Sequence, residues 1–455
     1  MSDLSRIIKA YDVRGTVPDQ LNEPVAEAIG RAYVQTLRAA GEAADQVVIA
    51  HDMRESGPGL ASAFARGVRS EGVDVVDAGL GSTDLLYFAS GSLDRPGAMF
   101  TASHNPAQYN GIKLCRRGAK PIGQDTGLAE IRDRAQAILD GGRPAQDGPK
   151  GAIEKRDLLG PYGAYLRKLV DLRNIRPLSV VVDAGNGMGG YTVPAVLGDL
   201  PLKIVPLYFE LDGTFPNHEA NPLEPANLVD LQRTVREHGA DLGLAFDGDA
   251  DRCFVIDERG AAVSPSAITA LVAVRELAKA PGAPIIHNLI TSRVVPEIVR
   301  EHGGVPVRTR VGHSFIKAEM ATTGAVFGGE HSAHYYFKDF WGADTGMLAA
   351  MHVLAALGEQ GRPLSELVED FVRYADSGEI NSQVADPQAK LDEIKRVYAH
   401  ERIDLLDGVT VDFADRSWVN VRPSNTEPLL RLNVEAPTVE RMAALRDELL
   451  ALIRR

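Results

Sequence analysis

The chain has 455 residues, 44% of them hydrophobic and 24% charged, so it has the composition of a soluble globular protein and the length of two to four domains. Its 62 acidic residues against 49 Lys and Arg give a net charge of −13, which argues against nucleic acid or an anionic membrane as the main partner because both need a basic face. Two cysteines, no apolar run behind the N-terminal charges and no uncharged apolar stretch of about 18 residues lead us to expect a cytoplasmic protein without disulfides, signal peptide or membrane span.

Strand-like runs alternate with helical stretches through the first 370 residues. Apolar runs predict strands in "QVVIAHD" from Gln46, "GAMFTAS" from Gly97, "LSVVVDAGNG" from Leu178 and "APIIHNLI" from Ala283. A pattern of helix, glycine turn and strand recurs three times, in "RSEGVDVVDAG" from Arg69, "REHGADLGLAFDG" from Arg236 and "REHGGVPVRTRVG" from Arg300. Such units build mostly parallel sheets, and ligands bind beyond the carboxyl ends of their strands.

The chain after about Asp370 has a different pattern. "GVTVDFADRSWVNVRPSNTEPLLRLNVEA" is mostly strand-like, and the closing "TVERMAALRDELLALIRR" places apolar residues at helical spacing. We therefore expect three related α/β domains with mixed, mostly parallel sheets at residues 1–150, 151–254 and 255–370, followed by an α+β domain at residues 371–455. The polar segment "DGGRPAQDGPKGA", near residues 140–152, is the expected linker after the first domain.

Ser103 and His104 stand side by side in "TASHNPAQYNGIK", directly after a predicted strand. The pair could be a nucleophile with its base, or ordinary loop chemistry. Adjacent side chains on an extended backbone point to opposite faces, so we expect them to form a poor hydrogen-bonded pair.

Three aspartates alternate in "DGDADR": Asp247, Asp249 and Asp251. An extended loop would aim all three carboxylates the same way, where they repel each other unless a hard divalent cation lies between them. An EF-hand is excluded because Arg252 occupies the sixth position, which needs glycine, and the flanks are strand-like. A solvated acidic turn is the alternative, but the preceding apolar strand favours a metal site.

Two further segments carry polar side chains suited to a sugar phosphate. "GGEHSAHYYF" offers Glu330, Ser332 and His334 at every second position, which suits a polyhydroxylated ligand or, alternatively, a polar edge strand. "RPSNTEPLLR" could grip a phosphate or form an Asx/ST turn. Its polar residues are Arg422, Ser424, Asn425, Thr426 and Arg431.

These four segments, in this order, resemble the α-D-phosphohexomutases, and most of all the bacterial phosphomannomutase/phosphoglucomutase branch. The resemblance covers essentially the whole chain. It implies three related α/β domains and a fourth α+β domain arranged around a central active-site cleft.

The resemblance also implies roles for the site residues. Ser103 would carry a phosphoryl group, and one Mg²⁺ would be held by the three aspartates and an oxygen of that phosphoserine. Arg252 would add positive charge, and either His104 or Lys113 would act as general acid/base. Glu330, Ser332 and His334 would bind the sugar. The phosphate that is not transferring would be bound by Arg422, Ser424, Asn425, Thr426 and Arg431, with His313 and Tyr11 nearby and Arg14 lining the cleft.

The implied reaction is that of an isomerase that transfers phosphate within one substrate. It interconverts hexose 1-phosphate and hexose 6-phosphate, of mannose, glucose or both, through a bound hexose 1,6-bisphosphate that also serves as activator. The implied partners are small sugar phosphates, and we expect a monomer.

One contact departs from the family pattern. Relatives often carry a basic residue in a "D-hydrophobic-K" segment of the third domain, whereas "NLITSR" places Ile290 there. Either the alignment slips by a residue or two, or another group such as Arg293 or His287 substitutes, and we leave this contact unassigned.

Three other functions compete with this interpretation. Phosphoglucosamine mutases usually have glycine where Asn425 stands and glutamine where His331 stands, which favours the mannose/glucose branch. A phosphatase could use Asp247 as its nucleophile, but "TASHNP" and "RPSNTEP" would then have no role. A catalytically idle sugar-phosphate binder would not need the full set of motifs.

Overall fold

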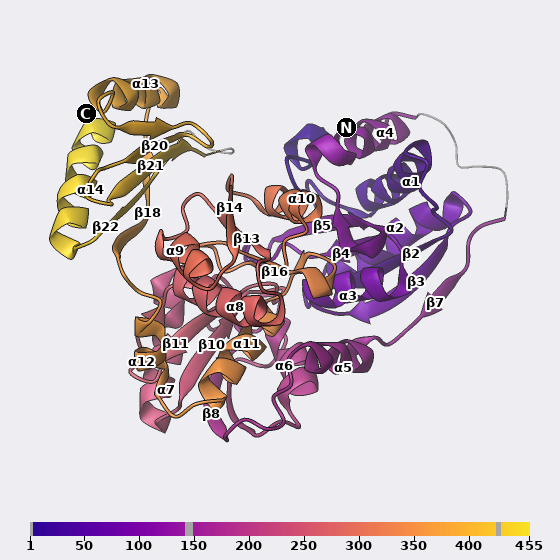
Figure 1. Cartoon of the computed structure of the whole chain (residues 1–455). Helices are drawn as coiled ribbons and strands as arrows, with labels where there is room; N and C mark the ends of the chain where they lie inside the picture. Colours follow the sequence, from indigo (N-terminus) through magenta and orange to yellow (C-terminus); the bar gives the residue numbers. More distant parts are fainter. Residues whose placement is uncertain (1–2, 142–148, 425–428) are drawn as a thin grey trace. The chain divides into compact units, whose positions relative to one another are not determined.

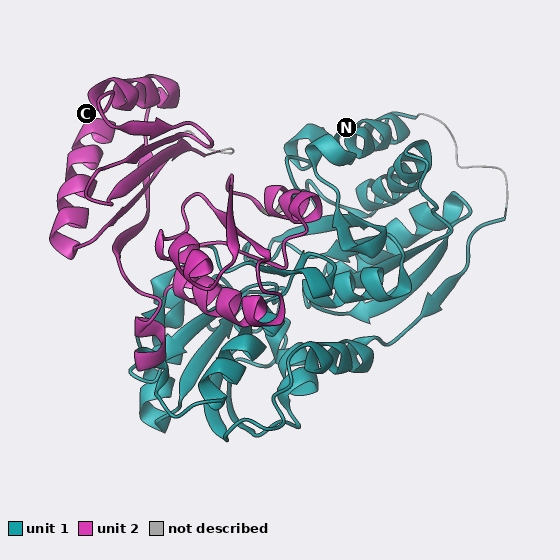
Figure 2. Ribbon diagram, viewed as in Figure 1, with its two compact units in different colours: residues 1–263, 332–365 teal, residues 264–331, 366–455 magenta. Residues whose placement is uncertain are grey.

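The computed structural model describes residues 3–141, 149–424 and 429–455 (Figure 1). The chain folds into two compact units, one of residues 1–263 and 332–365 and the other of residues 264–331 and 366–455 (Figure 2). Among the described residues, no helix has the length and apolar character that a membrane span requires.

The first unit opens with an α/β domain around a seven-stranded mixed sheet. Strands β2 (Gln46–His51), β3 (Asp74–Leu80), β4 (Gly97–Phe100) and β7 (Ile153–Lys155) are parallel, whereas β1 (Val13–Thr16), β5 (Tyr109–Arg116) and β6 (Lys120–Pro121) are joined by antiparallel pairs. The helices are α1 (Glu23–Ala39), α2 (Gly57–Ser70), α3 (Thr83–Leu93) and α4 (Leu128–Leu139).

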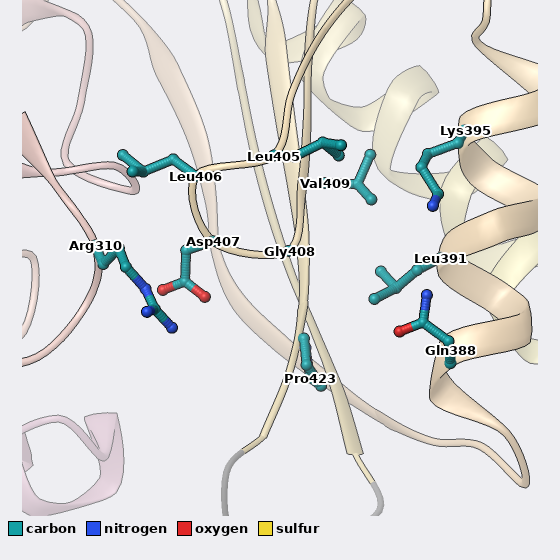
Figure 3. A pocket seen from close by; sticks show the side chains of 10 residues that line it. All are labelled: Arg310, Gln388, Leu391, Lys395, Leu405, Leu406, Asp407, Gly408, Val409 and Pro423. Atoms are coloured by element: carbon teal, nitrogen blue, oxygen red, sulfur yellow. The ribbon is translucent and has the colours of Figure 1, made fainter.

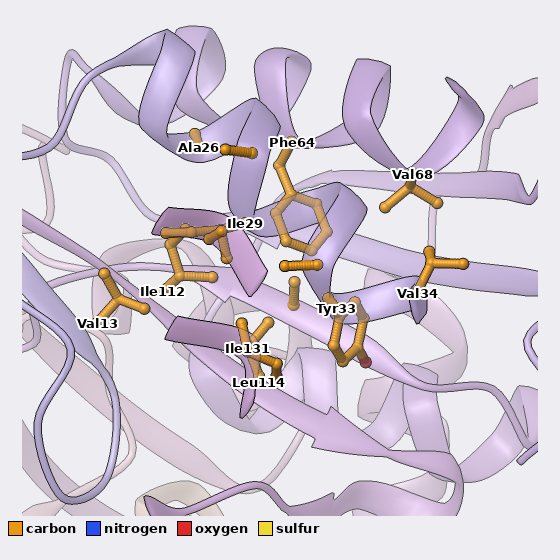
Figure 4. Close-up of a cluster of buried hydrophobic side chains, with 14 of the residues drawn as sticks. Val13, Ala26, Ile29, Tyr33, Val34, Phe64, Val68, Ile112, Leu114 and Ile131 are labelled. Atoms are coloured by element: carbon orange, nitrogen blue, oxygen red, sulfur yellow. The ribbon is translucent and has the colours of Figure 1, made fainter. Parts of the chain in front are cut away.

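The core of this domain lies between the sheet and helices α1, α2 and α4 (Figure 4). Phe64 of α2 packs edge-to-face on Phe100 of β4, with 5.5 Å between ring centroids. Helices α1 and α2 approach closely because Gly30 and Gly67 have no side chain. A Cβ on either glycine would lie 2.3 Å or less from a carbonyl oxygen of the other helix.

A second α/β domain follows in the same unit. Its mixed sheet has the order β12-β11-β10-β8-β9 and is formed by β8 (Leu178–Asp183), β9 (Leu202–Leu207), β10 (Leu242–Phe246), β11 (Cys253–Asp257) and β12 (Ala262–Val263). Helices α5 (Leu159–Leu169), α6 (Gly189–Leu197) and α7 (Val229–His238) accompany it. The same unit also contains the antiparallel pair β16 (Tyr335–Phe337) and β17 (Ala343–Asp344), which lies in a different sheet from β8–β12, and helix α11 (Gly346–Gly358).

The second unit contains a parallel sheet and an antiparallel sheet. Strand β13 (Pro284–Asn288) pairs in parallel with β14 (Val305–Thr309) and β15 (Phe327–Gly329), accompanied by α8 (Pro265–Lys279), α9 (Val294–Glu301) and α10 (His313–Thr323). After α12 (Leu364–Glu369), an antiparallel sheet of order β18-β22-β21-β20-β19 is covered by α13 (Pro387–Val397) and α14 (Val439–Arg454). Its strands are β18 (Ala375–Gln383), β19 (Arg402–Asp404), β20 (Val409–Asp412), β21 (Trp418–Pro423) and β22 (Leu429–Ala436).

The predicted helix–glycine–strand repeat is confirmed at all three places. Gly72, Gly239 and Gly303 have φ angles of 74°, 54° and 75°, each between a helix and a strand. This left-handed conformation costs glycine little, and it ends the helix and turns the chain back toward the sheet. The fold is therefore α/β with a C-terminal α+β region, as expected. The proposed linker lies mostly outside the described residues.

Candidate active site

Ser103 lies in the loop that follows β4, with its side chain directed at an aspartate of another domain. Its Oγ donates a hydrogen bond of 2.9 Å to Asp247 Oδ2, and only 5% of the residue is exposed. Its backbone is left-handed, at φ 51°, and its N–H donates to Thr101 Oγ1. The structure thus joins two sequence motifs that are 144 residues apart.

The expectation that Ser103 and His104 point to opposite faces is wrong. Their Oγ and Nδ1 atoms lie 3.3 Å apart. The expectation assumed an extended backbone, and the left-handed φ of Ser103 turns the two side chains toward each other.

The three aspartates form a buried acidic cluster in the loop between β10 and β11. Asp247, Asp249 and Asp251 are at most 1% exposed, and one carboxylate oxygen of each lies within 4.8 Å of the others. They converge through a turn with Ala250 at φ 59°, not through the extended loop that was predicted.

The acidic cluster has the donors that a hard cation requires. Oδ1 of Asp249 and Oδ1 of Asp251 are buried and have no hydrogen-bond partner among the described residues. Burial raises the pKa of Asp251, and the neighbouring Asp249 raises it further, so the group would be stabilised as a carboxylate by added positive charge. Unpaired carboxylate oxygens in this number fit a site for Mg²⁺.

Lys113 of β5 brings an ammonium group to the acidic cluster. Its Nζ donates to Asp249 Oδ2 at 2.7 Å and to Asp251 Oδ2 at 2.6 Å. Burial lowers the pKa of Lys113, but the two aspartates outweigh this effect and hold the pKa well above its usual value. In this arrangement Lys113 is a charged donor.

Arg252 connects the cluster to His104. Its Nε donates to Asp247 Oδ2 at 2.8 Å, and its Nη2 lies 2.7 Å from Nδ1 of His104. Burial and the adjacent guanidinium lower the pKa of His104 to about 2. The imidazole is therefore neutral with Nδ1 as acceptor, an assignment that follows from the hydrogen-bond network.

His334 approaches the same cluster, although its motif had suggested only sugar binding. Its backbone forms an isolated bridge with Arg252, and its Nε2 lies 3.8 Å from Asp251 Oδ1. Ser332 Oγ, 3.0 Å from Nδ1, orients the ring. The segment has strand residues at both ends, in β15 and β16, but residues 331–333 between them form a turn with Ala333 at φ 63°, so Glu330, Ser332 and His334 do not alternate along one extended strand.

Arg422 and Arg431 face each other across the pair β21–β22 in the second unit. Like charges directly opposite each other are destabilising, so the pair needs an anion nearby. Glu379 of β18 supplies one. It accepts a short hydrogen bond from Arg422 Nη2, and its Oε1 lies 3.5 Å from Arg431 Nη1. No sequence motif pointed to Glu379, because it stands alone 43 residues before Arg422.

The other predicted sugar and phosphate residues are only partly placed. Glu330 is buried, and its Oε1 accepts from the N–H of Gly312 at 3.2 Å. Ser424 donates its backbone N–H to Leu429 O at 2.8 Å. Asn425, Thr426 and the side chain of His313 lie outside the described part of the chain.

Of the two predicted N-terminal residues, Tyr11 and Arg14, Arg14 has the described contact with the serine loop. Arg14 donates from Nη1 to Asn105 Oδ1 and from Nη2 to Asp12 Oδ2, each at 2.5 Å. Tyr11 is half-buried just before β1. Arg14 therefore contacts the Ser103 loop through Asn105.

Among the described residues, neither Arg293 nor His287 offers an unpaired positive charge for the unassigned basic contact. Ile290 is buried in a small apolar cluster with Leu289 and Trp418. Arg293 forms an ion pair with Asp412, and burial lowers the pKa of His287 to about 4, which keeps it neutral.

Thr83 is a site residue that the sequence reasoning missed. At the start of α3, its Oγ1 donates to Asp249 Oδ2 at 2.6 Å, and its N–H donates to Asp249 O at 3.1 Å. Ser82 caps this helix by accepting from Leu85 N–H. The capping pattern in "GSTDLL" predicts a helix start, but it cannot tell what the helix end contacts.

A cavity of about 420 Å³ lies elsewhere, in the C-terminal region of the second unit (Figure 3). Leu391, Leu405, Leu406 and Val409 contribute apolar surface to it, and Arg310 and Lys395 contribute positive charge. The cavity and the acidic cluster therefore have no residue in common.

Comparison with known proteins gives a consistent result along the chain. Models of the phosphoglucomutase/phosphomannomutase family match residues 5–140 (alpha/beta/alpha domain I), 161–260 (domain II), 264–374 (domain III) and 379–452 (C-terminal domain). A phosphomannomutase of Salmonella montevideo is 40% identical, covering 98% of both chains. A protein of Xanthomonas campestris pv. campestris named phosphohexose mutases is 42% identical over 94% of both.

A solved structure extends this similarity to three dimensions. The phosphoglucomutase/phosphomannomutase family protein from Burkholderia thailandensis has a TM-score of 0.89 and 33% identity, covering 100% of this chain and 98% of its own. Because the family models span most of the sequence and relatives of about 40% identity align over nearly its full length, the chain belongs to the phosphoglucomutase/phosphomannomutase family.

Proposed function

We propose that this phosphohexomutase interconverts hexose 1-phosphate and hexose 6-phosphate, of mannose, glucose or both, with Ser103 as the phosphoryl carrier. The observation that carries the proposal is the hydrogen bond of 2.9 Å from Ser103 Oγ to Asp247 Oδ2 inside a buried cluster of three aspartates. A hydroxyl in this position can be phosphorylated beside ligands for a cation.

Asp247, Asp249 and Asp251 would hold Mg²⁺, which would neutralise part of the charge on a phosphoryl group at Ser103. Arg252, at most 2% exposed, adds a guanidinium next to the same hydroxyl through its contact with Asp247. Thr83 and Lys113 donate hydrogen bonds to the metal-binding carboxylates and fix their orientation.

Proton transfer to and from the sugar hydroxyl has three candidates. Lys113 holds a proton that it can donate, and neutral His104 has Nδ1 occupied by Arg252. His334, oriented by Ser332, is a third candidate because its Nε2 is directed at Asp251. We leave the general acid/base open among them.

Arg422 and Arg431 would bind the phosphate that is not transferring, in place of part of their interaction with Glu379. Glu330 and Ser332 would read the ring hydroxyls. Both cysteines are buried and neither forms a disulfide, which suits a reducing compartment. We also propose that the protein is cytoplasmic and acts as a monomer on small sugar phosphates.

Intact-mass measurement of the purified protein tests the central step. We expect a phosphoryl adduct on the wild type that is absent from Ser103→Ala, together with isomerisation of glucose 1-phosphate and mannose 1-phosphate by the wild type alone. Release of inorganic phosphate without isomerised sugar, with Ser103→Ala still active, would instead identify a phosphatase. A clear preference for glucosamine 1-phosphate would identify a phosphoglucosamine mutase.

A further inference from the structure

Arg54 is a buried arginine that belongs to none of the motifs above. It follows β2 in the segment "HDMRES" and is 2% exposed. Its guanidinium donates four hydrogen bonds to backbone carbonyls of a single loop. Nη2 donates to Ser103 O at 2.9 Å and Asn105 O at 2.7 Å, and Nη1 donates to Pro106 O at 2.9 Å and Tyr109 O at 2.8 Å.

The guanidinium is itself held firmly in place. Asp52 Oδ2 lies 3.3 Å from Arg54 Nε, and Asp52 Oδ1 accepts the backbone N–H of Arg54 at 2.9 Å. The ring of Phe215 covers the guanidinium, with 5.2 Å from its centroid to Cζ. The chain at Gly213 passes so close that a Cβ there would lie 2.8 Å from Arg54 Cα. A charge that is paired, stacked and enclosed in this way has little freedom to move.

We infer that Arg54 is a positioning residue that holds the Ser103 loop in the conformation needed for phosphoryl transfer. The carbonyls of Ser103, Asn105 and Pro106 turn toward one point, and buried carbonyls without partners are costly. A planar guanidinium has enough donors, in a fixed fork, to satisfy all of them. A left-handed non-glycine residue such as Ser103 persists only where its surroundings fix it, and Arg54 supplies that constraint through Ser103 O.

The chain offers a matched control in Arg167. Its Nη1 also donates to two backbone carbonyls, Ala195 O at 3.1 Å and Val196 O at 3.2 Å, but these lie at the end of helix α6 and not in the serine loop. In both Arg54→Lys and Arg167→Lys, a single ammonium group takes the place of a guanidinium that binds backbone carbonyls. Only the first is expected to disturb Ser103.

The test is a comparison of kcat and KM for wild type, Arg54→Lys and Arg167→Lys with glucose 1-phosphate, alongside thermal unfolding. Because a displacement of about 1 Å at a reacting group can reduce the rate about 100-fold, we expect kcat of Arg54→Lys to fall by about that factor while KM hardly changes. Arg167→Lys should keep the wild-type kcat, and thermal unfolding measures how much stability each variant loses. Equal kcat values for the two variants would overturn the inference.

Asp52→Asn provides a second variant if Arg54→Lys does not fold, because it nearly keeps the volume of the side chain and neutralises the carboxylate that pairs with Arg54. Its kcat should fall by about tenfold at unchanged KM, a smaller effect than for Arg54→Lys because the guanidinium is still present and only its ion pair is weakened. A wild-type kcat for Asp52→Asn would also overturn the inference. The inference rests on the proposed role of Ser103, and the two can fail separately: a wild type without phosphoserine refutes that role, whereas an active wild type with an equally active Arg54→Lys refutes only the inference.

Discussion

A methyl group at position 248 is expected to push Ser103 away from the acidic cluster. Gly248 lies between Asp247 and Asp249, and a Cβ added to it would lie 2.4 Å from Ser103 O. Real Cβ contacts essentially never fall below 3.0 Å, so Gly248→Ala requires a separation of at least about 0.6 Å. Ser103 O cannot retreat easily because it accepts a hydrogen bond from Arg54.

The displacement would separate Ser103 from the acidic cluster, and the proposed phosphoryl transfer depends on these two being close together. A misplacement approaching 1 Å can reduce the rate about 100-fold, so we expect kcat of Gly248→Ala to fall by one to two orders of magnitude. Mg²⁺ activation should also need a higher Mg²⁺ concentration, because the substituted loop holds the three proposed aspartate ligands. Steady-state kinetics over a Mg²⁺ titration measures both effects.

Gly160 gives the matched control for this substitution. It lies in α5, its φ is not positive, and a Cβ there would meet nothing within 4 Å. Gly160→Ala should keep the wild-type kcat, because the added methyl group meets no other part of the fold and lies outside the site. If Gly248→Ala has the same kcat and Mg²⁺ dependence as Gly160→Ala, the close contact at Gly248 does not position Ser103 for the reaction.

Three further substitutions probe the site and its surroundings. Thr83→Val removes the hydrogen bond to Asp249, and a bond to a charged group is worth about 1.5–3 kcal/mol. The Mg²⁺ concentration for half activation should therefore rise in Thr83→Val and return to the wild-type value in Thr83→Ser. An unchanged activation curve for Thr83→Val would contradict the proposal that Thr83 orients a metal ligand. Glu379→Gln removes the carboxylate that competes with the substrate phosphate for Arg422. We expect KM for the hexose phosphate to fall about fivefold, or ~1 kcal/mol, at similar kcat. A raised KM would show instead that Glu379 positions Arg422 for the substrate. Burial lowers the pKa of His287 to about 4. As the pH falls from about 6.5 to about 4, the imidazole is therefore protonated in the unfolded chain but not in the folded protein. The free energy of unfolding decreases by up to about 3 kcal/mol over that pH range. Urea unfolding at pH 7 and pH 4.5 should therefore show a smaller pH dependence for His287→Asn than for wild type, and equal dependences would exclude a buried neutral imidazole.

The local parts of the site were readable in the sequence. Glycine can adopt the left-handed conformation that ends a helix, so the segments around Gly72, Gly239 and Gly303 predicted their turns correctly. Apolar runs predicted the strands β4 and β10, and the position directly after each of them identified Ser103 and Asp247 as candidate site residues. These properties depend on a few neighbouring residues, which is why one sequence suffices.

Loop conformation was not readable in the same way. The alternation of the aspartates and the adjacency of Ser103 and His104 were interpreted on an extended backbone. The structure instead has left-handed residues at Ser103 and Ala250. A single φ angle of this kind redirects a side chain, and for a residue other than glycine it is imposed by contacts from elsewhere in the fold.

The helix–glycine–strand units, the buried strands and the residue types that follow them could be predicted from the amino-acid order alone. The three-dimensional fold was needed to see that Ser103 meets Asp247, that Arg54 binds the carbonyls of the serine loop, and that Glu379 interacts with two facing arginines. These contacts join residues separated by 43 to 144 positions, through sheet order and loop closure. Arg54 and Glu379 have no distinctive neighbours in the chain, and their roles arise from buried carbonyls and like charges that need a partner wherever the fold places one.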